Sequence, residues 1–126
     1  MIKYLTMVQT HQLNYFPVKG GISDIYSPRT IMGDPPIDYK KHCSISFGAY
    51  VQANHEQFPK NDQTACTLDC IYLRPCNNLQ GGHELMDLNS GRVITRRKVI
   101  EIPITEIVIK AVNEMGERQD FKSLKF

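Results

Sequence analysis

Several features that would place the chain in a broad class are missing from its 126 residues. No stretch approaches the run of about 18 apolar residues that a membrane helix needs. The N-terminal residues 1–8 are followed by a polar stretch, 9–12, where a secretory signal would continue its apolar block. An excess of one charge is missing too, because 15 basic and 13 acidic residues leave a net charge of +2. We therefore expect an intracellular protein of the cytoplasm or nucleus, with no membrane partner and no indication of nucleic-acid binding from bulk charge.

The motifs of common catalytic sites are also missing. The sequence has no Gly-x-x-x-x-Gly-Lys phosphate loop, no Gly-x-Ser-x-Gly nucleophile elbow and no His-Glu-x-x-His helix. His42 and Cys43 are adjacent, but adjacent side chains on an extended chain point to opposite faces, so we do not expect them to form a nucleophile–base pair. The sequence predicts no catalytic residue, no cofactor and no small-molecule substrate.

The cysteines do not have the spacing of a common metal site. They are Cys43, Cys66, Cys70 and Cys76. The last three follow a Cys-x3-Cys-x5-Cys pattern, whereas zinc fingers and ribbons usually pair their ligands as Cys-x2-Cys or Cys-x4-Cys. Histidines 42, 55 and 83 would have to complete a site. Because no secretory signal is present, we expect free thiols in a reducing compartment and no bound metal.

Residues from about 44 to 100 carry the signals of short β-strands. Apolar side chains alternate with polar or small ones from 45 to 51, and a second apolar run covers 68–73 and is stopped by Pro75. Residues 85–88 and 92–95 flank a turn at 89–91. Gly91 can supply the positive φ that such a turn needs. Polar residues at 54–65 and a glycine pair within 80–82 separate the strands. The pattern predicts a small antiparallel barrel or sandwich.

A helix is predicted at each end of this β region. Residues 2–14 have apolar side chains at roughly helical spacing, and Pro17 with the following glycine pair ends the segment. A second helix is expected from about 106 to 115, with Thr105 as its N-cap and Gly116 just past its end. Its apolar face comprises Ile107, Val108, Ala111, Val112 and Met115. Between 18 and 44, prolines and glycines punctuate the chain without a period, which predicts an irregular linker. The fold class is therefore α+β, mainly β.

A basic cluster occupies the strand after the predicted hairpin. Strict alternation places Arg92, Ile94, Arg96 and Lys98 on one face. Three cations on one face form a positive stripe that suits phosphate contacts. A solvated sheet face, or edge charges that discourage aggregation, would explain the same residues without a ligand.

Two further pairs of residues bear on this cluster. Lys40 and Lys41 would extend the stripe if the fold brings them near. Tyr50 and Tyr72 are candidate stacking surfaces for bases, with burial in the core as the alternative. The candidate nucleic-acid-binding residues are thus Arg92, Arg96, Lys98, Lys40 and Lys41.

A series of short blocks runs in order through most of the chain. The blocks are Leu13-Asn14-Tyr15-Phe16-Pro17, Gly21-Ile22-Ser23, Ser27-Pro28-Arg29, Asp38-Tyr39, Lys41-His42-Cys43, Phe47-Gly48-Ala49-Tyr50-Val51, Ile71-Tyr72-Leu73, Asn78-Leu79-Gln80-Gly81-Gly82, Leu88-Asn89-Ser90-Gly91-Arg92 and Glu101-Ile102-Pro103. In this order and spacing they resemble the segment that follows the integrase catalytic core in copia-type LTR retrotransposon Pol polyproteins. The resemblance spans about residues 12–116.

The resemblance implies a division of the chain into four parts. Residues 1–17 would be the tail helix of the integrase core, 18–44 the Pro/Gly-rich linker, 45–100 an SH3-like β-barrel, and 101–126 a C-terminal helix and tail. The carboxylate triad of the integrase and the reverse transcriptase would lie outside this chain. The parent polyprotein would therefore be an enzyme, and this chain would not.

The resemblance also implies a function. The chain would be an accessory module that supports DNA integration, with the DNA or RNA of the element, the integrase core or the reverse transcriptase as partners. A structural or protein-interaction module is the alternative, as is a degenerate remnant without activity. The remnant is suggested by departures such as Arg74-Pro75-Cys76-Asn77, which stands where the family tends to have a Gly-Pro turn.

Overall fold

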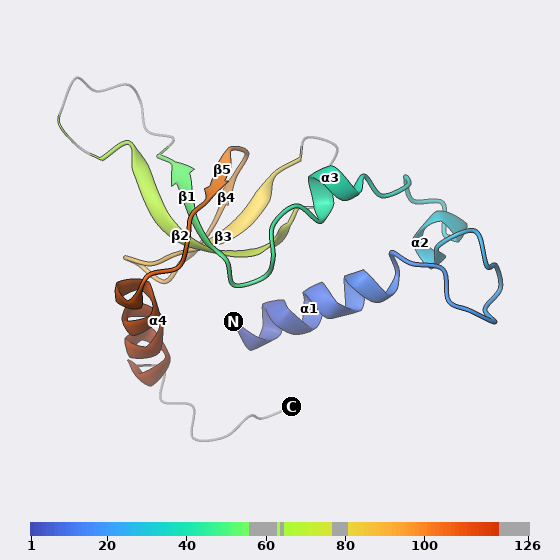
Figure 1. Cartoon of the computed structure of the whole chain (residues 1–126), viewed down its shortest axis with the longest axis horizontal. Coiled ribbons are helices and arrows are strands. Elements are labelled where there is room, and N and C mark those ends of the chain that lie inside the picture. Colours follow the sequence, from blue (N-terminus) through green and yellow to red (C-terminus); the bar gives the residue numbers. More distant parts are fainter. Residues whose placement is uncertain (56–62, 64, 77–80, 119–126) are drawn as a thin grey trace.

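The computed structural model describes residues 1–55, 63, 65–76 and 81–118, and these form an α+β fold around one antiparallel sheet (Figure 1). The strands are β1 (Tyr50–Asn54), β2 (Thr67–Pro75), β3 (His83–Asp87), β4 (Val93–Arg96) and β5 (Val99–Glu101). The helices are α1 (Ile2–Leu13), α2 (Pro28–Ile31), α3 (Tyr39–His42) and α4 (Glu106–Arg118). The mainly-β class and the two terminal helices are as predicted.

The sheet has the strand order β4-β3-β2-β1-β5. Strands β1 to β4 follow one another as an antiparallel meander, and β5 returns to pair with β1 through the register Val51↔Glu101 to Ala53↔Val99. The sheet is strongly curved (Figure 1), but β4 and β5 remain its edges and it does not close.

One face of the sheet carries the core. Alternation along the strands brings five buried side chains together on this face: Val51, Ala53, Cys70, Tyr72 and Leu85. Partly buried side chains surround them, including Ile94 and Val99 from the last two strands. Removal of this apolar area from water is the main force that holds the strands together, at about 25 cal/mol per Å².

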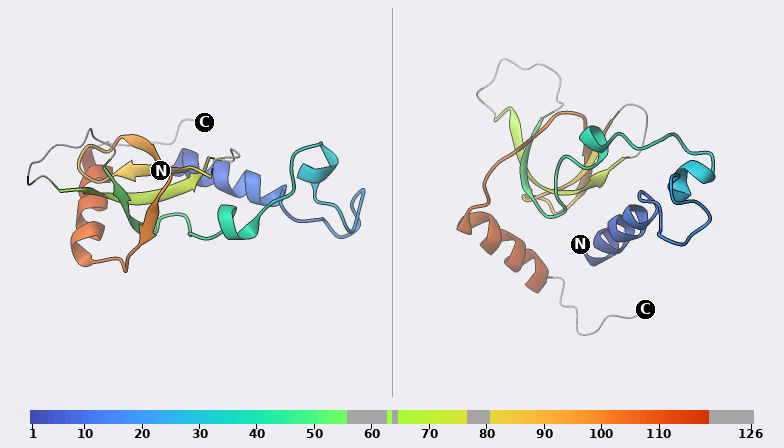
Figure 2. Two further views of the ribbon diagram at one scale, coloured as in Figure 1. Left: turned by 90° about the horizontal axis from the view of Figure 1, so that it is seen from above. Right: turned by 45° about the vertical axis from the view of Figure 1, so that its right-hand side comes forward.

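Helix α1 lies against the opposite face. Ile71 and Leu73 of β2 point to this side and are buried, and α1 packs on β2 with Val8 as its buried residue. α1 and α4 lie on the same side of the sheet (Figures 1 and 2). α4 buries Val108, and its Met115 sulfur lies 3.7 Å from where a Cβ on Gly91 would stand.

The C-terminal helix differs from its prediction at two points. Gly116 lies inside α4, which continues to Arg118, so it does not end the helix. Ile107 was assigned to the apolar face but is 79% exposed, whereas Val108 is buried and Ala111, Val112 and Met115 are half-buried. The buried stripe is therefore narrower than the sequence indicates.

The first predicted strand begins later than expected. Residues 45–49 form a turn in which Gly48 has a φ of 83° and the Ala49 amide donates to the Ser46 carbonyl, so regular pairing starts only at Tyr50. Ile45 and Ala49 nevertheless pack against the core, which explains why their alternation resembled a strand. Most of the predicted loop at 54–65, and part of the turn at 80–82, lies outside the described residues.

Strand β2 contains a β-bulge. Tyr72 pairs with Leu85 and Arg74 pairs with Glu84, so Leu73 is an extra residue without a counterpart on β3. Beyond the bulge, the pairing continues to Pro75↔His83. The strand therefore extends through Pro75, which was predicted to stop it.

The linker is not wholly irregular, because two one-turn helices lie within it. Ser27 caps α2 by accepting a hydrogen bond from the Thr30 amide, and Pro28 occupies the first turn. Asp38 caps α3 by accepting from the Lys40 amide over 3.1 Å. The segment that carries α2 projects away from the sheet in every view (Figure 2).

Candidate nucleic-acid interface and the α1–β2 pocket

Three consecutive basic residues form the turn between β4 and β5. Arg96 is the last residue of β4, the chain bends at Arg97, and Lys98 precedes Val99 of β5. Arg97 and Lys98 are exposed, and Arg96 is half-buried. We call these three residues the basic turn. It places two exposed cations where the chain crosses from one edge strand of the curved sheet to the other.

The structure does not contain the predicted positive stripe along one exposed face. Ile94 packs against the core cluster, so the face that it shares with Arg92 and Arg96 is the core face of β4. The regular strand ends at Arg96, and the bend that follows breaks the alternation before Lys98. The alternation of side chains along β4 was predicted correctly. The packing of Ile94 on the core shows that the side of β4 that carries Ile94 and Arg96 faces inward.

Arg96 is held by the protein itself. Its Nε donates to the main-chain carbonyl oxygen of Asn54 at 3.1 Å, and its Nη1 donates to that of Thr95 at 2.7 Å. These bonds fix the guanidinium across the open end of the curved sheet. The hydrogen bonds of Arg96 therefore stabilise the fold, and its positive charge lies beside those of Arg97 and Lys98.

Arg92 lies at the other end of β4, beside the β3–β4 turn. It is exposed, and its carbonyl accepts a hydrogen bond from the Asp87 amide at 2.9 Å. The Asp87 carboxylate organises this turn by accepting from the Asn89 and Ser90 amides and from the Ser90 hydroxyl. Burial alone would raise the pKa of Asp87, but these hydrogen bonds outweigh it and lower the pKa. Strand β4 lies between Arg92 and the basic turn, so the two are separated by its length.

Lys40 and Lys41 lie in α3, and the fold brings α3 close to the basic turn. Lys40 is exposed. His42, the last residue of α3, lines a pocket together with Tyr72, whose hydroxyl is 3.2 Å from Nδ1 of His83. His83 is directly opposite Arg96 in the β3–β4 register. Lys40, Arg96 and Lys98 therefore lie towards one end of the sheet, and Arg92 lies at the other end of β4.

Tyr72 does not offer an open stacking surface, and Tyr50 is only partly exposed. Tyr72 is only 2% exposed, and its hydroxyl is 3.2 Å from Nδ1 of His83. Tyr50 is half-buried and donates from its hydroxyl to the Asp69 carboxylate at 2.8 Å. Burial, which the sequence left open as the alternative, is the outcome for Tyr72.

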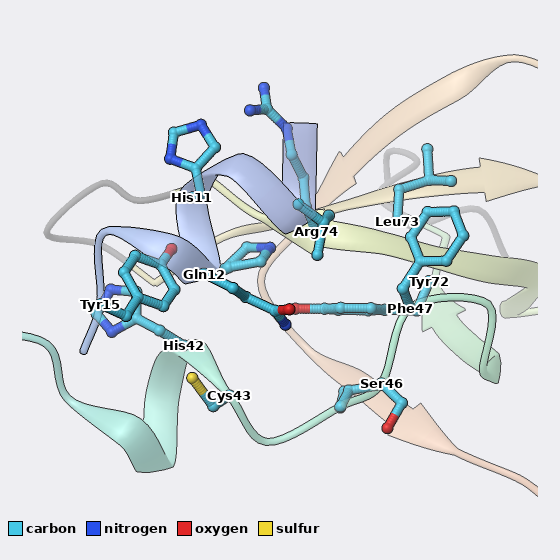
Figure 3. Close-up of a pocket in the computed structure, with 13 residues that line it drawn as sticks. His11, Gln12, Tyr15, His42, Cys43, Ser46, Phe47, Tyr72, Leu73 and Arg74 are labelled. Atoms are coloured by element: carbon cyan, nitrogen blue, oxygen red, sulfur yellow. The ribbon is translucent and has the colours of Figure 1, made fainter. Parts of the chain in front are cut away.

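A pocket that the sequence did not indicate lies between α1, the α3–β1 segment and β2 (Figure 3). Its volume is about 130 Å³. We call it the α1–β2 pocket. Its lining comprises Val8, His11, Gln12 and Tyr15 from the first segment, His42, Cys43, Ile45, Ser46 and Phe47 from the second, and Tyr72, Leu73, Arg74 and Pro75 from β2. No sequence signal could have found it, because its walls are far apart along the chain.

His42 and Cys43 both line this pocket, contrary to the expectation that they point apart. That expectation assumed extended backbone, whereas His42 ends α3 and Cys43 is its C-cap. Burial raises the pKa of the Cys43 thiol, which disfavours the thiolate that nucleophilic catalysis needs. Nδ1 of His42 is 2.9 Å from the main-chain oxygen of Asp38. The pair therefore lacks the features of an activated nucleophile.

The arginine of the pocket is neutralised. Arg74 donates from Nε and Nη2 to the two carboxylate oxygens of Glu84, at 2.7 and 2.9 Å. The two side chains are only 22% and 20% exposed. This bidentate pair leaves the pocket without a net charge from Arg74.

The predictions on thiols, metal ligands and membrane helices can be compared with the structure only in the described part of the chain. The four cysteines are free thiols, and no group of three or more metal-ligating side chains gathers among the described residues. In the same residues, no helix has the length and apolar character needed to span a membrane. Comparison of the chain with protein-family models, curated proteins and solved structures finds no match.

Proposed function

We propose that this chain is the SH3-like accessory module of the integrase region in a copia-type retrotransposon polyprotein. The ordered sequence blocks support this family. The strand order supports the fold, because an SH3-like barrel is a meander of five antiparallel strands whose last strand returns to the first. The hydrogen bond between Arg96 and Asn54 adds further support, since it draws β4 towards β1 as barrel curvature requires.

The module contacts nucleic acid and performs no catalysis of its own. The observation that carries this proposal is the basic turn, whose Arg97 and Lys98 are exposed. Exposed lysines and arginines bind phosphates by releasing condensed counterions, which gives affinity without sequence specificity. Such contacts would hold the DNA of the element while the integrase core acts on it.

The test is DNA binding measured against salt concentration. Fluorescence anisotropy with a labelled duplex should show binding at low salt, and Lys98→Ala should make the slope of log K against log salt shallower by about 0.9 if one phosphate contact is lost. Lys110→Ala, the same change on exposed α4, should leave the slope unaltered. No binding at low salt, or equal effects of the two variants, would contradict the proposal.

A second function, as a protein-interaction module, is favoured by a separate observation. The segment that projects from the sheet exposes large apolar side chains, notably Ile22 at 95%, Ile25 at 82% and Met32 at 83%. Contiguous apolar side chains in water usually mark a protein interface. If copies associate through this segment, sedimentation velocity should show self-association that Ile22→Ser with Ile25→Ser removes. A monomer under all conditions would leave the integrase core or the reverse transcriptase as the expected partner.

A further inference from the structure

The α1–β2 pocket has no role in phosphate binding, but its chemistry suits another part of the same ligand. We propose that it binds one unstacked base of a single-stranded nucleic acid whose phosphates contact the basic turn. This inference rests on the proposed function. Its grounds are the size of the pocket, the balance of charge in its lining, its hydrogen-bonding groups and its position.

The size of the pocket favours a single ring system. Pockets for complete small-molecule ligands usually measure about 300–1,000 Å³, whereas this one measures about 130 Å³. A group that enters it would therefore be one part of a larger molecule that continues outside. A base that projects from a polynucleotide strand meets this condition.

The charge of the lining favours a neutral group. Arg74 is the only Lys, Arg, Asp or Glu among the lining residues, and Glu84 holds it in the bidentate pair. A phosphate or a carboxylate would find no free cation in the pocket to offset its desolvation. An uncharged heterocycle would not incur this cost.

The remaining lining can recognise a planar ring with polar edges. The amide of Gln12, the hydroxyl of Ser46 and the imidazoles of His11 and His42 can donate or accept hydrogen bonds. Phe47 supplies an aromatic ring to the same lining. Splayed-out bases are usually recognised by this combination of stacking and edge hydrogen bonds.

The pocket lies within reach of the basic turn. Tyr72 lines the pocket, and its hydroxyl is 3.2 Å from Nδ1 of His83. His83 is the register partner of Arg96, so the two Cα atoms are roughly 5 Å apart. One strand can therefore contact Lys98 with its phosphates and place a neighbouring base at the pocket.

The experiment compares two strands of equal length and charge. A single-stranded thymidine 12-mer and an all-abasic 12-mer are titrated into the full chain at fixed low salt and followed by fluorescence anisotropy. Because base–aromatic contacts contribute about 1–3 kcal/mol per base, the strand with bases should bind about 5- to 150-fold more tightly.

A matched pair of variants locates the effect. Ser46 and Ser44 are both exposed and lie two residues apart in the same segment, but only Ser46 lines the pocket. Ser46→Phe should fill the pocket and reduce binding of the 12-mer to the abasic level, while Ser44→Phe should have no effect. As a second pair, Gln12→Ala should weaken binding and Gln9→Ala on the same helix should not.

The outcomes separate this inference from the function on which it rests. If both strands bind equally with the same salt dependence, the pocket does not bind a base, although phosphate binding stands. If the base-containing strand binds more tightly but Ser46→Phe and Ser44→Phe behave alike, the base binds elsewhere and the inference is overturned. If neither strand nor a duplex binds at low salt, the proposed function fails and the inference fails with it.

Discussion

The guanidinium of Arg96 donates a hydrogen bond from Nε to the main-chain carbonyl oxygen of Asn54, over 3.1 Å. Arg96 ends β4 and Asn54 ends β1, and two strands lie between them in the sheet. The two ends can meet only because the sheet curls strongly. This contact therefore links the basic turn to the curvature of the fold.

Removing this contact should lower stability. Arg96→Ala is expected to reduce the free energy of unfolding by about 1 kcal/mol, the usual contribution of such a hydrogen bond, and to lower Tm by about 4 °C. Arg92→Ala, the same change at the other end of β4, should alter stability by less than about 0.5 kcal/mol. Urea denaturation of both variants measures the difference, and equal effects would show that the Asn54 contact does not stabilise the curl.

Two glycines should respond to the same substitution with opposite signs. Gly91 has a φ of 68°, which L-residues adopt only with strain, so Gly91→Ala should lower the free energy of unfolding by about 1 kcal/mol. Gly116 lies in α4 with no atom within 4 Å of an added Cβ, so Gly116→Ala should raise it by about 0.5–1 kcal/mol. Thermal and urea unfolding measure both. A destabilising Gly116→Ala would indicate that α4 ends before this residue.

The ion pair at the rim of the pocket should contribute more than an exposed pair. The side chains of Arg74 and Glu84 are 22% and 20% exposed. Glu84→Gln removes the negative charge of this pair and is expected to lower the free energy of unfolding by about 1–2 kcal/mol. Glu114→Gln breaks the pair with Arg118, whose groups are 3.7 Å apart and mostly exposed, and should cost less than about 0.5 kcal/mol. Chemical denaturation at low salt compares them; similar costs would mean that burial adds nothing to the Arg74–Glu84 pair.

Stability should depend on pH through His83. Burial, and then the nearby His42, lower the pKa of His83 below its usual value of 6.5. Arg96, opposite His83 in the register, also faces it. The unfolded chain therefore takes up this proton more readily than the folded one, so the stability due to neutral His83 is present above about pH 6.5 and declines as the pH falls below it. Unfolding between pH 7.5 and 5 should show this decline.

The variant His83→Gln identifies the residue responsible. It should make the decline with falling pH smaller, whereas His11→Gln on α1 should retain it. Only the slope of the free energy of unfolding against pH is compared, because His83→Gln also changes the contact with the Tyr72 hydroxyl and so the stability at every pH. Identical slopes in both variants and the unmodified chain would exclude His83 as the source.

The features that the sequence predicted correctly depend on local signals. α1, α4 and the hairpin of β3 and β4 follow from the spacing of apolar residues and from the glycine at 91, which act within a few residues. The caps Ser27 and Asp38 were equally local and could have revealed α2 and α3. Their helices are too short to show a period, which is why the linker was predicted to be irregular.

The features that the sequence did not reveal depend on contacts between distant segments. Alternation along β4 was visible, but only the packing of Ile94 on the core shows that the arginine side faces inward. The approach of α3 to the basic turn, and the pocket between α1 and β2, come from how the chain folds back on itself. Residue patterns carry no information on such distances.

The bulge at Leu73 determines on which side of the sheet the Arg74 guanidinium lies. If the pairing ran on regularly past Tyr72, Leu73 would pair with Glu84 and Arg74 with His83, so the guanidinium would enter the core beside Tyr72 instead of meeting its carboxylate. A one-residue shift of this register would thus be far more harmful than a change of length in the linker. We expect this stretch of β2 to be the part of the chain least tolerant of changes in length.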